Sequence, residues 1–173
     1  MARLPYLEKT DLAPEDHDLL ARPITLFKCM THSPKAARAF HGLGHFIRHE
    51  SRLDPRLREL AILAVGWVTR SPYEWSHHVK ISQDFGVTDD DIKGLITELD
   101  GKSNSLDPVA KLVIKAAREM TTTLTVPDAT FAALKIMSRR NGRSPDLRRQ
   151  NSGKLLKDKR FTFQTIVILL HRR

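Results

Sequence analysis

Hydrophobic positions recur along this chain at the spacing of α-helices. From residue 34 onward, apolar side chains return every three or four residues, as they do on the buried face of a helix. Clear examples are Ala37, Phe40, Leu43 and Ile47, and later Val109, Leu112, Val113, Ala116 and Met120. No segment of residues 1–137 alternates between apolar and polar positions as a half-buried strand does. The pattern predicts an all-α protein.

Helix start signals divide this pattern into about six helices. Serine or aspartate followed by proline is typical of a helix N-terminus, because the side chain caps free N–H groups and proline fits the first turn. Gly86 is typical of a left-handed helix end. The helices are predicted to begin at Ser33-Pro34, Asp54-Pro55, Ser71-Pro72, Thr88, Asp107-Pro108 and Pro127. Residues 1–33 form a lead-in interrupted by prolines, with a short helix expected from Glu15 to Leu20.

The helix after Asp54 is the most apolar part of the chain. Every residue from Leu60 to Val68 is apolar or glycine, which predicts burial on all sides. Glu59 stands at the start of this run, so its carboxylate is expected to enter the interior. A buried carboxylate needs a partner or stays protonated. Arg58 and Arg70 are both candidate partners, so Glu59 has a structural interpretation as well as a functional one.

The next helix carries the second group of candidate residues. Ser71 and Glu74 have the spacing of a capping box, which by itself would explain Glu74. Glu74 and His78 are four residues apart, share a face and can touch. A histidine titrates near neutrality and can deliver a proton, and a neighbouring carboxylate favours its charged form. His77 points about 100° away on the same helix and is interpreted as a surface or interface residue.

Three short motifs resemble the carboxymuconolactone decarboxylase family, which also contains the alkylhydroperoxidase-D-like proteins. They are Arg58-Glu59-Leu60-Ala61, Tyr73-Glu74-Trp75-x-x-His78 and Gly86-Val87-x-x-x-Asp91-Ile92. The resemblance is specific over residues 53–92 and looser from about Pro34 to Leu134. It implies an all-α helical bundle of the alkylhydroperoxidase-D-like type that assembles as trimers or hexamers. It also implies a pocket where the glutamate helix meets the histidine helix.

The peroxidase-like branch of that family carries Cys-x-x-Cys, with a histidine four residues after the second cysteine. Counting back from His78, Glu74 and Ser71 occupy those places, and the only cysteine is Cys29. Dithiol chemistry needs two neighbouring thiols, so peroxidase activity is excluded. The motif is similar to that of the decarboxylase branch instead.

The decarboxylase branch implies loss of carbon dioxide from a small carboxylated lactone, with His78 as proton donor. Glu59 and Glu74 are the further catalytic candidates. No metal or organic cofactor is expected, because the ring carbonyl of the substrate accepts the electron pair. Tyr73, Trp75 and Ser71 are the candidate substrate-binding residues, with core packing as the alternative for the two aromatic side chains.

The charge of the chain is uneven. Residues 138–173 contain eleven Lys or Arg and two acids, and the rest of the chain has 18 of each sign, so the tail carries the whole net charge of +9. Ser138 therefore marks the expected end of a helical domain, residues 1–137, and the start of a basic, poorly ordered tail that is atypical of the family. With one cysteine, no apolar leader and no apolar run long enough for a membrane span, a cytoplasmic protein without membrane contact is expected.

Several alternatives to catalysis stay open at this point. An unrelated C-terminus in place of a family helix would give a non-catalytic or defective member, whereas a functional basic tail would bind an anionic partner. A basic segment alone is weak evidence for nucleic acid. His41, His45 and His49 lie four residues apart, a spacing that metal ligands use, but no carboxylate joins them as a third type of ligand. A solvated or subunit-facing stripe is the favoured interpretation.

Overall fold

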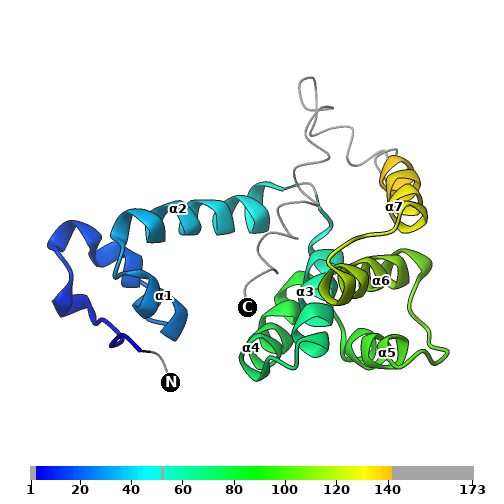
Figure 1. Cartoon of the computed structure of the whole chain (residues 1–173), viewed down its shortest axis with the longest axis horizontal. Coiled ribbons are helices and arrows are strands. Elements are labelled where there is room, and N and C mark those ends of the chain that lie inside the picture. The colour runs from blue at the N-terminus through cyan, green and yellow to red at the C-terminus, as the bar shows by residue number, and fades with distance from the viewer. Residues whose placement is uncertain (1–2, 52, 142–173) are drawn as a thin grey trace. The chain divides into compact units, whose positions relative to one another are not determined.

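The computed structural model describes residues 3–51 and 53–141, and these fold into helices and loops without a strand. The all-α prediction is confirmed (Figure 1). The α-helices are α1 (Thr25–Met30), α2 (Pro34–His45), α3 (Pro55–Val68), α4 (Pro72–Ser82), α5 (Asp89–Leu99), α6 (Pro108–Thr123) and α7 (Asp128–Asn141). None of these helices is long and apolar enough to span a bilayer.

The chain divides into two compact units, Met1–Ser51 and Arg52–Arg173. The predicted boundary between a helical domain and a basic tail at residue 138 stays a prediction, because residues 142–173 lie outside the described part. The backbone of α7 continues past that position to Asn141.

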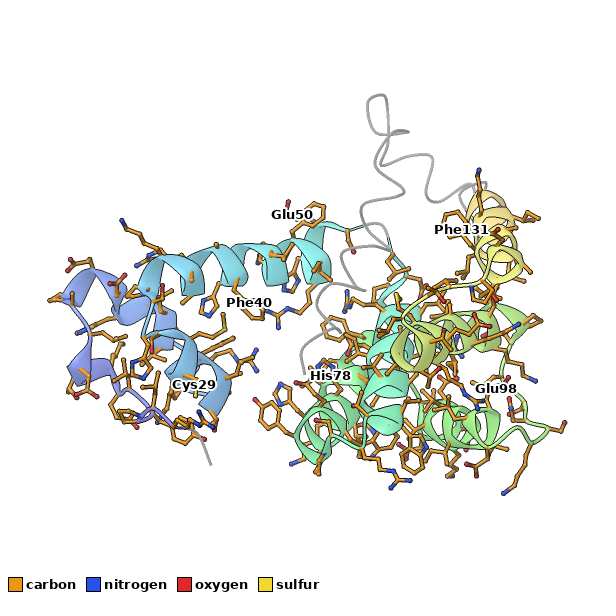
Figure 2. The ribbon with its side chains drawn as sticks, in the orientation of Figure 1. Cys29, Phe40, Glu50, His78, Glu98 and Phe131 are labelled. Carbon is orange, nitrogen blue, oxygen red and sulfur yellow. The ribbon has the colours of Figure 1, made fainter. Side chains whose placement is uncertain are left out.

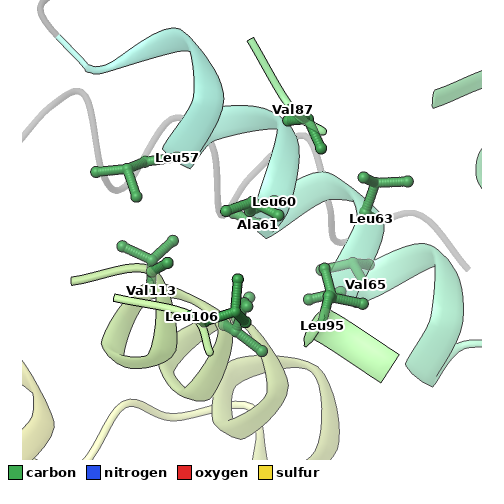
Figure 3. Packing of buried hydrophobic residues seen from close by; sticks show 13 residues of the cluster. Leu57, Leu60, Ala61, Leu63, Val65, Val87, Leu95, Leu106 and Val113 are labelled. Carbon is green, nitrogen blue, oxygen red and sulfur yellow. The ribbon is translucent and has the colours of Figure 1, made fainter. Parts of the chain in front are cut away.

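Helix α3 is the centre of the second unit. It packs against α4, α5 and α6, which Figure 1 shows grouped around it. Its side chains Leu60, Leu63 and Ala64 are fully buried and meet Leu95 of α5 and Ile114 of α6 in one apolar cluster (Figure 3). Burial of this kind contributes roughly 1.5–3 kcal/mol for each large side chain, so α3 supplies much of the stability of the unit.

The prediction that α3 is buried on all sides is wrong at two of its apolar positions. Trp67 is 39% exposed and Ile62 is half-buried. Trp67 packs against Trp75 of α4, with ring centroids 4.9 Å apart, while part of its surface stays in water.

Capping side chains fix the starts of α3, α4, α5 and α6 at the predicted places, whereas α2 begins at Pro34 without a side-chain cap from Ser33. Asp54 accepts a hydrogen bond from the Leu57 N–H at 3.0 Å. Thr88 and Asp91 form a complete capping box, in which each side chain accepts from the other residue's backbone N–H. Gly86 ends the turn that follows α4 with a φ of 86°, a conformation that glycine adopts without strain.

The first unit is built from α1, α2 and a 3₁₀-helix at Pro14–Leu20, where the short helix was expected. Arg38 of α2 holds this segment by hydrogen bonds to Asp16 and Asp18. A surface hollow is lined by Glu15, Asp16, His32, Ser33, Pro34, Lys35 and Arg38. None of the predicted catalytic residues lines this hollow.

The histidine stripe of the first unit does not act as one cluster. Helix α2 ends at His45 and continues as a wider π-helical turn, Phe46–Glu50. His41 packs on Phe27, whereas His45 and His49 pack on each other. Within the described residues no three potential metal ligands come together.

Candidate functional site

Two helices of the second unit bring the predicted catalytic residues together. Glu59 lies on α3 and His78 on α4, 19 positions later in the sequence. Gly66 makes the close packing of these helices possible, because a Cβ atom there would lie 3.3 Å from the backbone nitrogen of Trp75. The glycine therefore sets the distance between the helix that carries the acid and the helix that carries the imidazole.

The Glu59 carboxylate is buried and accepts a hydrogen bond on each of its oxygens. Its exposed fraction is 1%. Oε1 accepts from the Arg58 Nε–H at 3.0 Å, and Oε2 lies 2.8 Å from His78 Nδ1. The prediction that this acid enters the interior with a partner is therefore correct, and it has two partners.

Burial and the two partners act in opposite directions on the pKa of Glu59. Removal from water raises the pKa of a carboxyl group. The hydrogen bond and charge of His78, followed by those of Arg58, lower it, and the balance leaves the pKa of Glu59 below its ordinary value. Glu59 is thus ionised at neutral pH, although it is shielded from water.

The contact with Glu59 fixes the tautomer of His78. An ionised carboxylate only accepts hydrogen bonds, so the Nδ1 atom of His78 must carry a proton and donate it. The side chain of His78, labelled in Figure 2, remains 17% exposed. Nε2 is therefore the ring atom left to gain or lose a proton, as in other sites where an acid orients a histidine.

Glu74 is placed differently from Glu59. Its Oε2 lies 3.7 Å from His78 Nε2, which is an ion-pair distance rather than a hydrogen bond, and its side chain is 47% exposed. Ser71 accepts from the Glu74 N–H at 3.4 Å, but the Ser71 N–H donates to the Gly66 carbonyl oxygen. The predicted capping box is thus only half formed, and the Glu74 carboxylate faces His78.

The three predicted substrate-binding residues lie on the first turn of α4 and just before it. Ser71 is the N-cap residue, Tyr73 is exposed, and Trp75 is half-buried against the core. The Tyr73 ring is parallel to that of His77 at 5.9 Å, and His77 meets His78 edge-on at 5.6 Å. Trp75 therefore packs on the core, which the sequence analysis gave as the alternative to substrate binding. Contact of these residues with a substrate stays a prediction.

Arg58 is part of the site, although the sequence suggested it only as a possible ion partner. Its guanidinium lies 4.4 Å from the centre of the Phe85 ring, in the turn after α4, and the residue is 1% exposed. Arg70, the other candidate, is exposed and has a left-handed backbone conformation with φ of 52°. The fully apolar run that follows Glu59 was the available signal, because it predicted that residues beside it are buried.

Comparison with known proteins agrees with the resemblance. Residues 34–100 match the family model described as "Carboxymuconolactone decarboxylase family", and this range includes Arg58, Glu59, Glu74 and His78. Neither a search of curated proteins nor a search of solved structures gave a match.

Proposed function

Since residues 34–100 match the model of the carboxymuconolactone decarboxylase family, we propose that the protein is a carboxy-lyase that uses no cofactor and acts on a small carboxylated lactone. His78 is the proton donor. The observation that carries the proposal is the buried pair of Glu59 and His78, which orients an imidazole through one nitrogen and leaves the other available.

The reaction needs an acceptor for one electron pair and a donor of one proton. When the bond between the ring and its carboxylate breaks, carbon dioxide leaves and the electron pair passes into the conjugated lactone as a dienolate. Proton transfer from His78 Nε2 to the ring carbon then restores a neutral lactone, and the imidazole recovers a proton from solvent. The substrate thus carries its own electron acceptor, and the protein has to supply only orientation and a proton.

Glu59 and Glu74 have separate parts in this scheme. Glu59 accepts the hydrogen bond from the Nδ1–H of His78 throughout, so the neutral imidazole formed after transfer keeps its proton on Nδ1 and the same orientation. Glu74 faces Nε2 and stabilises the charged imidazolium before transfer. General acid catalysis by a positioned side chain is worth roughly 10²–10⁴ in rate.

The test is carbon dioxide release from a panel of carboxylated lactones. We expect turnover by the wild-type protein, and a loss of about a hundredfold or more with His78→Ala. His49→Ala is the matched control, because His49 is an exposed histidine of the first unit and should leave the rate unchanged. Equal rates for wild type and His78→Ala would remove His78 from the mechanism. No turnover of any lactone by the wild-type protein would favour a non-catalytic family member.

A further inference from the structure

Arg58 places a permanent positive charge inside the site, next to the acid that orients His78. The guanidinium binds Glu59 Oε1 through Nε, while His78 binds Oε2 of the same carboxylate. Arg58 and Glu59 are each 1% exposed, so water screens their charges weakly. The stacking of the guanidinium on Phe85 holds it in place from the side of α4.

The charge balance of this cluster depends on the state of His78. Protonation of the imidazole adds a positive charge to a carboxylate that already binds the positive Arg58, and the half-exposed Glu74 lies 3.7 Å from Nε2. Among the described residues, Glu59 of α3 and Glu74 and His77 of α4 contact His78, and Arg58 of α3 binds the second oxygen of Glu59.

We propose that Arg58 is a positioning residue that makes His78 a stronger acid, because it binds the carboxylate on which the imidazolium depends and repels the imidazolium itself. Its use in catalysis rests on the proposed function, whereas its effect on the proton of His78 can be measured without a substrate. Arg58 thus reduces the electrostatic stabilisation that Glu59 gives to the charged imidazole, while the hydrogen bond between Glu59 and Nδ1–H remains. Glu59 can then orient the ring while Nε2 still gives up its proton.

The experiment is an NMR titration of the His78 ring in the full chain, with the resonance assigned by its loss in His78→Ala. We expect Arg58→Gln to move the titration midpoint upward by about one pH unit, since a like charge is removed and Glu59 loses its competing partner. Arg58→Lys, which keeps the charge, should restore most of the wild-type midpoint. Arg56→Gln is the matched control, because Arg56 lies on the same helix but binds Asp91 and Asp107.

A midpoint that does not move in a folded Arg58→Gln protein would overturn the proposal, as would an equal upward shift in Arg56→Gln. If Arg58→Gln does not fold, the His78 titration midpoint is compared between Glu59→Gln and the double variant R58Q/E59Q. There the double variant should titrate at the higher pH, because the repulsion by Arg58 does not require a charged Glu59, and equal midpoints would overturn the proposal. Failure of lactone turnover would leave these titrations unaffected, so the two proposals fail separately.

Discussion

Glu59 keeps its charge inside the protein because both of its oxygens are bound to nitrogen donors. Arg58 and His78 offset the cost of removing the carboxylate from water, and the pKa of Glu59 stays below its ordinary value, with burial acting against this shift and His78 as the main cause of it. Glu59 therefore affects both the stability of the fold and the proposed site, since the hydrogen bond that stabilises its carboxylate also orients the imidazole of His78.

Replacement of Glu59 by glutamine should therefore destabilise the fold. The amide cannot balance the buried charge of Arg58, and breaking a buried ion pair costs about 3 kcal/mol or more. Urea unfolding of Glu59→Gln against wild type measures this loss. Glu74→Gln is the control, because Glu74 is half exposed and its ion pair with His78 should be worth less than about 1 kcal/mol. Equal losses for the two variants would contradict the assignment of Glu59 as the buried member.

At the scale of helices, the distance between α3 and α4 decides whether an acid and an imidazole meet. Gly66 is the contact point, where α3 approaches the backbone of Trp75. A helical glycine costs stability relative to alanine, so its presence in the middle of α3 has a packing reason.

Gly66→Ala tests this close approach. Alanine should gain about 1 kcal/mol from helix propensity, but its Cβ at 3.3 Å from a backbone nitrogen forces α4 outward. We expect a net loss of thermal stability together with a weaker Glu59–His78 contact, seen as a shifted His78 titration. Gly42→Ala in α2 is the control, since nothing lies within 4 Å of its Cβ position and the same propensity gain should appear without the cost. Stabilisation of equal size at both positions would contradict the packing role.

Three helices of the second unit are joined by a second ionic group. Arg56 of α3 donates to Asp91 of α5 at 2.9 Å and to Asp107, the N-cap residue of α6, at 2.9 Å. The hydrogen bond from Arg56 is the main reason that the pKa of Asp91 is lowered from 3.8 to about 2. This group fixes the starts of α5 and α6 relative to α3.

Stability should therefore fall as the pH drops below about 4, with Glu59 adding to the loss. The folded-state pKa of Asp91 lies below its unfolded value, so the unfolded chain binds more protons between pH 4 and 2 and gains relative stability there. For Asp91 the effect amounts to about 2 kcal/mol. Urea unfolding between pH 7 and pH 2 should show this slope, reduced in Asp91→Asn. Asp90→Asn, at an exposed position, should keep the wild-type slope.

For the whole molecule, self-association stays a prediction, and α7 and the residue before it carry exposed apolar side chains that can test it. Phe131 and Ile136 of α7 and Leu124 before it are all exposed. Large apolar side chains that gather on a surface are typical of interaction sites. Assembly as a trimer or hexamer, which the family resemblance implies, therefore needs a direct measurement.

Light scattering after size-exclusion chromatography tests the assembly. We expect a mass of three or six times the 19.7 kDa of the chain. A double variant, F131S/I136S, should lower the mass if α7 forms the interface, because two apolar contacts are lost without a change of charge. Lys135→Gln, which lies on the exposed side of the same helix, is the control. A monomeric wild-type protein would rule out the assembly expected for the family.

The sequence by itself determined the helices and most of their caps, because these depend on neighbours within one or two turns. Its short motifs also predicted the resemblance that the family model matches over residues 34–100. The four-residue spacing of Glu74 and His78 was visible in this way, as was the burial of Glu59 beside an apolar run. Only the tertiary structure decided that Glu59 rather than Glu74 binds the imidazole closely, and that Arg58 rather than Arg70 is the partner of the acid. The physical reason is that the contact between Glu59 and His78 joins α3 to α4, so its geometry is set by the close packing of these helices at Gly66 rather than by spacing along the chain. Arg58 is the sequence neighbour of Glu59, and its role depends on the burial of both side chains, which only the packing of α3 determines.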